Sequence, residues 1–287
     1  MKQYILILCV MTASLVMGCT TGSTRKPVQI TKLPETTKNQ SYVHWRKRQG
    51  PAYDGDFWRS FGRDGKEFAP RLWDDTTALV KNPVSLICLG AAGTAGIALS
   101  GPNADDRVQR HYEKHGSQLN TFGDMVGDIG GNPGTHFAIA GAMYFASLAG
   151  EEPETYENAK TLLRALALNG TFTIMLKAAA HTECPNGSEN GWPSGHTSSS
   201  FTLATVLWNE YGPLVGVPLM GFAGYVGYER CDARNHDFSD VISGALIGTA
   251  IGYAVCKNEE LRIGEFTVVP FVDPQSGGAG LALAKRW

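Results

Sequence analysis

Residues 190–197, with the sequence NGWPSGHT, combine residue types that can bind an anion. Pro193 suits the first turn of a helix, and Gly195 has no Cβ, so an anion can approach the backbone closely. Free N–H groups at the start of the apolar segment that follows, together with Ser194 and His196, would form a phosphate site. An ordinary helix N-cap with a surface histidine is the alternative for these eight residues alone.

A second group of polar residues lies on either side of this stretch. His236 and Asp240 are four residues apart, so a helical turn would place them on one face. Asp240 could then accept the imidazole N–H and leave the other nitrogen of His236 free as a nucleophile. Arg230 could donate two hydrogen bonds to phosphate oxygens, and Lys177 adds another positive charge. Helix capping and helix-dipole roles explain Asp240 and Lys177 singly, but the whole set favours phosphate chemistry.

Taken along the chain, these residues form three motifs that resemble those of the type 2 phosphatidic acid phosphatase superfamily. That superfamily also contains bacterial acid phosphatases and vanadium haloperoxidases. The family's first motif is Lys, six residues, Arg-Pro, and it corresponds to Lys177–Pro185. The second, Pro-Ser-Gly-His, corresponds to Pro193–His196, and the third, Ser-Arg, five residues, His, three residues, Asp, to residues 229–240. With the intervening apolar segments, the resemblance covers residues 84–256.

The resemblance implies hydrolysis of a phosphate ester without a metal ion or other cofactor. His236 would attack phosphorus and form a phosphohistidine, with Asp240 holding the imidazole. His196 would protonate the leaving oxygen and then activate the water that releases phosphate. The phosphate oxygens would be bound by Lys177, Arg230, Ser194 and Gly195. The expected substrate is a phosphomonoester or a diphosphate. A membrane anchor would favour a lipid phosphate, and soluble periplasmic phosphate esters are equally compatible with the chemistry.

Two positions depart from the family pattern. Cys184 stands where the first motif has arginine, and Glu229 stands where the third has serine. A neutral thiol cannot form a charged pair with phosphate, so turnover should fall by about 10- to 100-fold without compensation. Arg234 is a candidate for the compensating charge. Alternatively, the family fold would bring Cys184 and Cys231 together as a disulfide.

Two other functions are compatible with these motifs. Cys184 favours a non-catalytic envelope lipoprotein that binds phosphate, and a vanadium haloperoxidase would use His236 to ligate vanadate. The chain has 25 Lys and Arg against 27 Asp and Glu, so its charge gives no case for a nucleic-acid partner. The sequence leaves the individual substrate and the oligomeric state open.

The first residues resemble the start of a bacterial lipoprotein. Residues 1–18 contain a positive charge at Lys2 followed by an apolar run that is short for a membrane span. This pattern is typical of a signal peptide. The run ends Val-Met-Gly before Cys19, which resembles the site at which lipoproteins are cut and acylated. Thr20 in place of aspartate implies sorting to the outer membrane, on its periplasmic side, where acyl chains on Cys19 would anchor the protein.

The expected architecture is an all-α bundle of the acid phosphatase and haloperoxidase type over residues 51–260, after a flexible tether at 19–50. The aromatic-rich stretch 51–81 predicts short amphipathic helices that pack on the domain, with contact to lipid as the alternative. Apolar segments predict buried helices at Val84–Ser100, Thr135–Ala149, Ala159–Ala180, Thr197–Tyr211, Val217–Tyr228 and Val241–Val255. A membrane-embedded bundle is the alternative, because hydropathy alone does not exclude it.

Two further stretches complete the predicted organisation. Residues 123–134 are rich in glycine and predict a polar loop, in which Asp128 and the nearby His136 rim the pocket or simply fill the loop. Residues 261–287 change to a strand period and predict a small β-hairpin of Phe266–Val272 and Ala279–Lys285. Pro270 would confine the first of these strands to an edge position.

Overall fold

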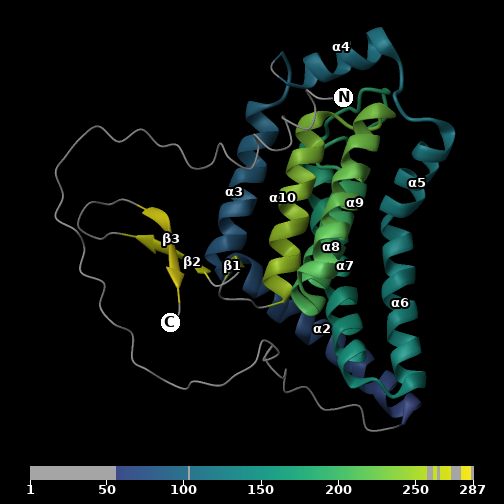
Figure 1. Ribbon diagram of the computed structural model, residues 1–287, viewed down its shortest axis with the longest axis vertical. Helices are drawn as coiled ribbons and strands as arrows, with labels where there is room; N and C mark the ends of the chain where they lie inside the picture. Colours follow the sequence, from purple (N-terminus) through teal and green to yellow (C-terminus); the bar gives the residue numbers. More distant parts are fainter. Residues whose placement is uncertain (1–55, 103, 257–260, 264–265, 273–278, 286–287) are drawn as a thin grey trace. The chain divides into compact units, whose positions relative to one another are not determined.

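The computed structural model describes residues 56–102, 104–256, 261–263, 266–272 and 279–285. The predicted signal peptide, Cys19 and the tether lie outside these residues and stay predictions. The helices are α2 (Phe57–Lys81), α3 (Pro83–Ala98), α4 (Asp105–His115), α5 (Thr121–Gly131), α6 (Pro133–Gly150), α7 (Pro153–Ala180), α8 (Gly195–Tyr211), α9 (Pro213–Asp232) and α10 (Phe238–Val255) (Figure 1). The predicted all-α class is therefore confirmed.

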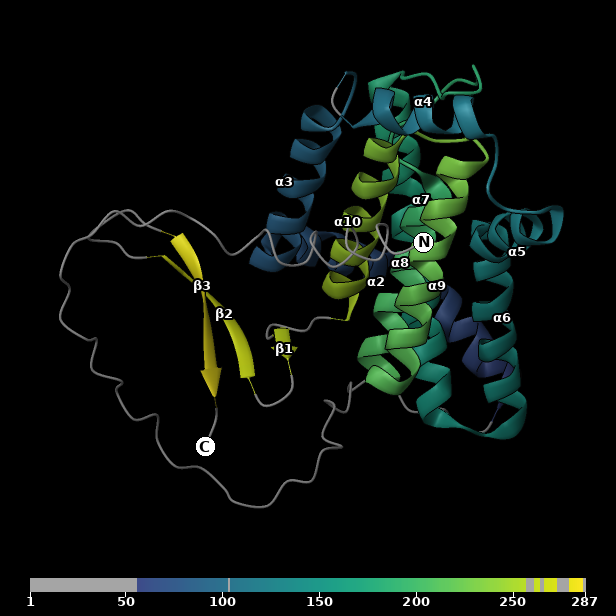
Figure 2. The same cartoon turned by 45° about the horizontal axis from the view of Figure 1, so that its top comes forward.

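Helix α8 lies in the interior of the bundle, packed against α7, α9 and α10 (Figures 1 and 2). Helix α3 packs on α10, while α6 packs on α7 and α5 packs on α9. The core between these helices is made of aliphatic side chains that are at most 1% exposed, such as Leu162, Leu166, Val206, Ile247 and Ile251. Burial of this apolar surface is the main force that holds the helices together.

Glycines let α10 approach α8 closely. A Cβ added at Gly248 would lie 2.1 Å from the carbonyl oxygen of Ser198, and one at Gly244 would lie 2.7 Å from that of Ser194. Both neighbours are backbone atoms, so any larger residue would push the two helices apart. This close packing holds the N-terminal ends of α8 and α10 together, where the second and third motifs lie.

Helix α2 is one helix of 25 residues instead of the several short ones predicted. Its polar side faces the bundle, where Asp75 accepts a hydrogen bond from Nε of Arg164 at 2.7 Å and Asp64 lies 3.0 Å from Nζ of Lys160. The large aromatic side chains Trp58 and Trp73 are 76% and 70% exposed. The prediction that the aromatic residues pack on the domain is wrong for these two, because charged side chains of α7 attract the polar face of α2 instead.

Helices α4 and α5 were not predicted. The glycine-rich stretch expected as a loop forms α5, which begins after Asn120, whose side chain accepts from the backbone N–H of Gly123 at 2.8 Å. A Cβ added at Gly127 would lie 2.5 Å from Cγ of Glu229 on α9, so the small residues serve close helix packing. The contact with α9 overrides the weak helix propensity of glycine.

Several helices have apolar character on their outer surfaces. By length and composition, α7 and α10 could each cross a membrane, and α2 with α3, which are bent by 73° relative to each other, could form a third span. Ile97, Phe122 and Leu214 are 81%, 69% and 90% exposed. The membrane-embedded alternative therefore stays open beside that of a bundle tethered by lipid.

The C-terminal strands are β1 (Leu261–Ile263), β2 (Phe266–Val272) and β3 (Ala279–Lys285), paired antiparallel in the order β1-β2-β3. In the register of β2 and β3, Val269 faces Ala282. Pro270 pairs with Leu281 of β3 and lies beyond the part of β2 that pairs with β1. It therefore has a strand partner on one side, as at a sheet edge. Residues 273–278 lie outside the described residues, and the hairpin as a unit stays a prediction.

Candidate active site

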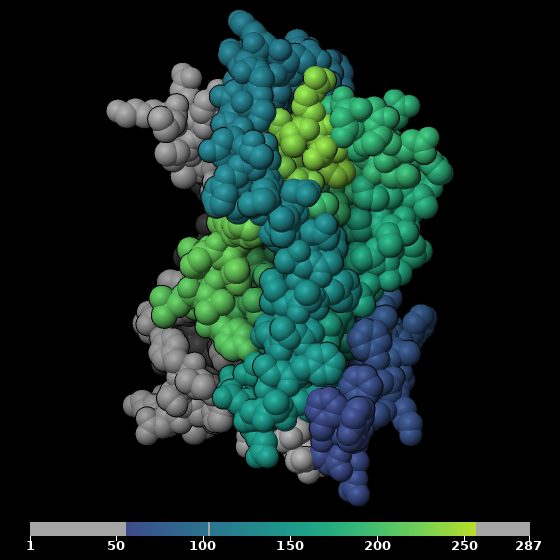
Figure 3. Space-filling model, turned by 90° about the vertical axis from the view of Figure 1, so that its right-hand side faces the viewer, coloured from purple at the N-terminus to yellow at the C-terminus, as the bar shows by residue number. Residues whose placement is uncertain are grey.

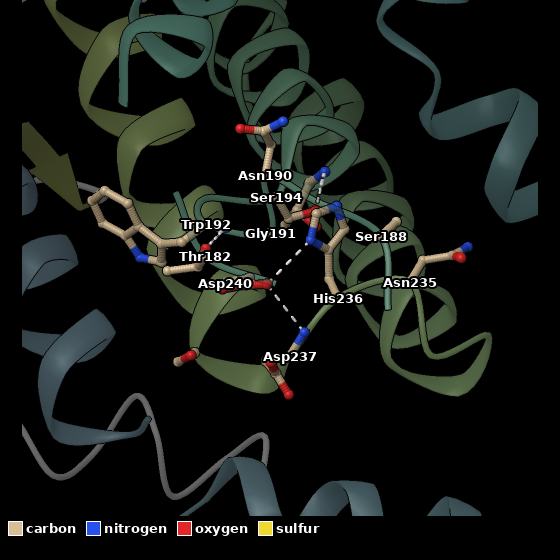
Figure 4. Close-up of polar contacts among 12 residues, drawn as sticks. Thr182, Ser188, Asn190, Gly191, Trp192, Ser194, Asn235, His236, Asp237 and Asp240 are labelled. Carbon is tan, nitrogen blue, oxygen red and sulfur yellow. Dashed lines mark hydrogen bonds and ion pairs between the residues drawn. The ribbon is translucent and has the colours of Figure 1, made fainter. Parts of the chain in front are cut away.

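His236 and Asp240 lie beside each other at the start of α10 (Figure 4). Nδ1 of His236 is 3.2 Å from Oδ2 of Asp240, and the same oxygen accepts from the backbone N–H of Asp237 at 3.2 Å. Asp237 and Asp240 form a capping box, which fixes the Asp240 carboxylate. The predicted contact is present, but His236 precedes α10, so helix capping and not a shared helical turn creates it.

The loop between α7 and α8 packs over this pair. The backbone N–H of Ser194 donates to the carbonyl of Asp240 at 3.1 Å. Nζ of Lys177 donates to the carbonyl of Asn190 and, at 3.0 Å, to that of Gly191. A Cβ added at Gly191 would lie 3.2 Å from Oδ2 of Asp240 and 3.0 Å from the carbonyl oxygen of Glu183, so a larger residue would fit only if these neighbours shifted by a few tenths of an ångström. Two of the three N–H groups of Lys177 hold the loop, which leaves one for an anion within the described part of the chain.

Helix α8 begins at Gly195, and Ser194 is its N-cap. The Ser194 side chain is fully buried, and its Oγ accepts from the backbone N–H of Thr197 at 3.4 Å. The capping role considered as the alternative for this residue is thus present, and its role toward phosphate stays a prediction. The N–H groups of Gly195 and His196 belong to the first turn, where a helix has no internal acceptors, so they can bind an anion.

Arg230 lies in the last turn of α9 and is 4% exposed. Its Nε and Nη2 donate to the Glu229 carboxylate at 2.5 and 2.6 Å, so the residue that replaces the family's serine orients the guanidinium. Nη1 of Arg230 lies 2.9 Å from Oδ1 of Asp128 on α5, and this oxygen is also 3.5 Å from Nε2 of His196. Two carboxylates therefore share one guanidinium beside the predicted general acid.

Asp128, expected either to rim the pocket or to fill a loop, lies beside Arg230 and His196, on α5 instead of in a loop. On the face shown in Figure 3, the segment of α5 and α6 lies beside α9. A carboxylate near Arg230 could have been found only by predicting this helix, because Asp128 lies outside all three motifs. His136 on α6 is 2% exposed, and it links α5 and α8 through contacts with the Gly130 carbonyl at 2.8 Å and Ser199 Oγ at 2.7 Å. It is a buried packing residue and does not rim the pocket.

Burial lowers the pKa of both predicted catalytic histidines. The pKa of His196 falls to about 4 because of burial and the nearby Arg230, against an opposing effect of Asp128. The pKa of His236 is also lowered by burial, although its hydrogen bond to Asp240 opposes the change. Both rings are therefore mainly neutral at pH 7, which suits a nucleophile. His196 can act as an acid once a bound phosphate dianion raises its pKa.

The predicted disulfide between Cys184 and Cys231 is wrong, since both residues are free thiols. Cys231 packs with Tyr112 and Val241, and burial raises the pKa of its thiol. The two loops do meet as the family resemblance implied, but through a different contact. Nδ2 of Asn186 donates to Oδ1 of Asn235 at 3.0 Å.

Arg234 does not supply the charge that is missing at Cys184. Its Nη2 lies 3.4 Å from Oε1 of Glu113 on α4, and its side chain is 41% exposed. Its backbone is left-handed, with φ of 57°, in the turn that follows α9. Arg234 thus pairs with α4, and Lys177 and Arg230 remain the predicted cations of the site.

A family model identifies the superfamily to which this chain belongs. The model of the PAP2 superfamily matches residues 84–262, so the chain belongs to this superfamily, as predicted. Over 72 residues the chain is 38% identical to the lipid A 1-phosphatase of Porphyromonas gingivalis (strain ATCC 33277), a match that covers 24% of this chain and only 16% of that protein. The crystal structure of Aquifex aeolicus LpxE matches 53% of this chain and 94% of that chain, with 24% identity and a TM-score of 0.44.

Proposed function

We propose that this protein is a phosphatase that hydrolyses a phosphate ester through a phosphohistidine, and that its substrate is a phosphorylated membrane lipid. The observation that carries the proposal is the contact of His236 with Asp240, beside the first turn of α8 and Arg230, in a member of the PAP2 superfamily. A nucleophile held by a carboxylate and a separate histidine acid are the groups that two-step phosphoryl transfer requires.

In the first step, Nε2 of His236 attacks phosphorus, and the bond between phosphorus and the leaving oxygen breaks. Asp240 accepts the hydrogen bond from Nδ1–H and balances the positive charge of the phosphohistidine. His196, protonated in the substrate complex, gives its proton to the leaving oxygen, so the alcohol departs uncharged.

In the second step, water attacks the phosphohistidine and the bond between phosphorus and nitrogen breaks. His196, now neutral, accepts a proton from this water and returns to its protonated form. Inorganic phosphate leaves and His236 is free for another cycle. The net reaction converts one phosphate ester and one water molecule into an alcohol and phosphate.

The transferring phosphoryl group is bound by positive groups that are already in place. Nη1 of Arg230, the remaining N–H of Lys177 and the first-turn amides of Gly195 and His196 provide donors for its oxygens. The hydroxyl of Ser194 is a further donor in this proposal. These groups supply the charge stabilisation without a metal ion, so activity in the presence of a chelator is expected.

A membrane location supports a lipid substrate. Large apolar side chains exposed on α3, α5 and α9 are suited to contact with acyl chains. The relative named lipid A 1-phosphatase also directs the proposal to a phosphorylated lipid, although the match covers little of that protein. We propose a location in the bacterial cell envelope, with acylated Cys19 as the anchor on the periplasmic side of the outer membrane.

Cys184 favours a second candidate function, which is phosphate binding without turnover. The thiol is 8% exposed and carries no positive charge toward phosphate. The measurement that separates the two functions is phosphate release by the purified full chain in detergent, with a chelator present, from a lipid phosphate and an aryl phosphate.

The control variants identify the residues responsible for any activity. His196→Ala should reduce turnover of the lipid phosphate by about 10²- to 10⁴-fold, because it removes the general acid and base. His236→Ala should abolish measurable turnover, whereas His115→Ala, at an exposed histidine of α4, should retain it. Full activity of His236→Ala would refute the proposed nucleophile, and phosphate binding without release in the wild type would establish the second function.

A further inference from the structure

We propose that Asp128 makes the site selective for phosphomonoesters over diphosphates, by placing a carboxylate on the side from which the leaving group departs. The inference rests on the proposed function, because it takes His196 as the acid that protonates the leaving oxygen. It narrows the substrate class, which the sequence motifs leave as a monoester or a diphosphate.

The contacts of Asp128 define where its carboxylate lies. Oδ1 is 2.9 Å from Nη1 of Arg230 and 3.5 Å from Nε2 of His196. Nε2 of His196 is buried and, apart from its approach to Asp128, has no hydrogen-bond partner among the described residues, so it is available to the leaving oxygen, which must reach it to receive a proton. The Asp128 carboxylate therefore lies where the phosphate and the leaving group meet.

Arg230 has one permanent and one exchangeable acidic partner. Glu229 is 1% exposed and binds two nitrogens of the guanidinium, whereas the Asp128 side chain is 57% exposed and contacts one. A phosphate oxygen can replace Asp128 at Nη1 while Glu229 still orients Arg230. The displaced carboxylate can turn away from Nη1 by rotation of a short side chain.

The backbone that carries Asp128 is held close to the site, so the displaced carboxylate stays near the leaving group. Next to Asp128, Gly127 packs so closely on α9 that an added Cβ would lie 2.5 Å from Cγ of Glu229. One turn earlier, the Tyr225 hydroxyl donates to the Gly123 carbonyl at 2.8 Å. These contacts fix α5 against α9, and only the side chain of Asp128 is free to move.

The charge near the leaving group decides which substrates this arrangement accepts. The alcohol of a monoester is uncharged, whereas the leaving group of a diphosphate is a phosphate that carries negative charge. A carboxylate near that charge should weaken transition-state binding of the diphosphate by about 10-fold at partly solvated positions. Glu229 and Arg230 compensate each other, and among the described residues Asp128 is the acidic group that contacts both Arg230 and His196, where it can act on the leaving group.

The experiment compares two substrates with the same lipid tail, farnesyl phosphate and farnesyl diphosphate, on the purified full chain in detergent. The wild type should show the higher kcat/KM with the monophosphate. Asp128→Asn keeps the size of the side chain and removes its charge, so the ratio of the two kcat/KM values, measured at one pH, should fall by about 10-fold and include a gain with the diphosphate.

Asp124→Asn is the matched control, since Asp124 lies one turn earlier on α5 and the same charge is removed. The ratio should change by less than about twofold in this variant, because Asp128 and not the half-buried Asp124 forms the contacts with Arg230 and His196. An unchanged ratio in Asp128→Asn, or equal changes in both variants, would overturn the inference.

A binding measurement separates this inference from the proposed function. Calorimetric titration with inorganic phosphate and with pyrophosphate needs no turnover. In one outcome, the wild type hydrolyses neither lipid but binds phosphate more tightly than pyrophosphate, and Asp128→Asn reduces this preference. That outcome would support the role of Asp128 and refute the phosphatase function. Turnover with the same substrate ratio in both proteins would support the phosphatase and refute the role of Asp128. A wild type that binds neither anion would refute both.

Discussion

The low pKa of His196 predicts that activity depends on pH in a particular direction. His196 must be protonated to act as the general acid, and its pKa in the free protein is lowered to about 4 by burial and by Arg230. A group that is active in its protonated form loses activity as the pH rises above its pKa. Activity governed by this group should therefore decrease from mildly acidic to neutral pH.

The size of the effect follows from that pKa. At pH 7 a group with a pKa of about 4 is protonated in roughly one molecule in a thousand, and each pH unit toward acid raises this fraction about tenfold. The value of kcat/KM reports the free protein, so it should rise steeply between pH 7 and pH 5. The value of kcat should change less, because a bound phosphate dianion raises the pKa of His196.

The assay is the pH profile of kcat and kcat/KM for an alkyl phosphate and for 4-nitrophenyl phosphate. The nitrophenolate leaving group needs little protonation, so its profile should be flatter and His196→Ala should impair it less. Asp128→Asn should move the alkaline limb of the alkyl phosphate profile to lower pH, because Asp128 raises the pKa of His196. A kcat/KM for the alkyl phosphate that stays level or rises from pH 5 to pH 7 would refute the assignment of His196 as the acid.

Three substitutions test other parts of the account. Glu229→Ala leaves the buried Arg230 guanidinium without its bidentate partner, so chemical denaturation should show a loss of about 3–5 kcal/mol in stability. An unchanged midpoint would contradict the assigned pairing. Cys184→Arg restores the charge of the family pattern and should raise kcat/KM by about 10-fold, and no gain would mean that the site compensates for the thiol. Gly248→Ala places a Cβ 2.1 Å from a backbone oxygen and should destabilise the fold by about 1–3 kcal/mol, whereas Gly170→Ala, with nothing within 4 Å of its Cβ, should not.

Much of the bundle and the predicted site could be derived from the sequence, because apolar runs and polar motifs alternate along it. The segment predicted at Val241–Val255 matches α10, and Lys177 lies in the last turn of α7 as expected. His236 and Asp240 meet as predicted, although helix capping and not the helical turn expected from their spacing brings them together. These features depend on the types of residues that are close together in the chain, and a single sequence shows these types directly.

The features that could not be predicted depend on contacts between distant segments. Helix α5 is rich in glycine and has weak intrinsic propensity, so only its close packing on α9 explains it. Asp128 reaches Arg230 through that packing, and Arg234 pairs with Glu113 of α4, a helix that was not predicted. The exposed aromatic side of α2 also depends on distant contacts, because the acidic residues on the other side of this helix pair with basic residues of α7.

The phosphohistidine is the central claim, and trapping it is the most direct test. The full chain would be incubated briefly with a ³²P-labelled lipid phosphate, quenched with denaturant at alkaline pH and digested for mass spectrometry. The account predicts an acid-labile, alkali-stable phosphoryl group on the peptide that contains His236, and no labelled peptide in His236→Ala. Turnover by the wild type without such a label, or with the label on another residue, would contradict it.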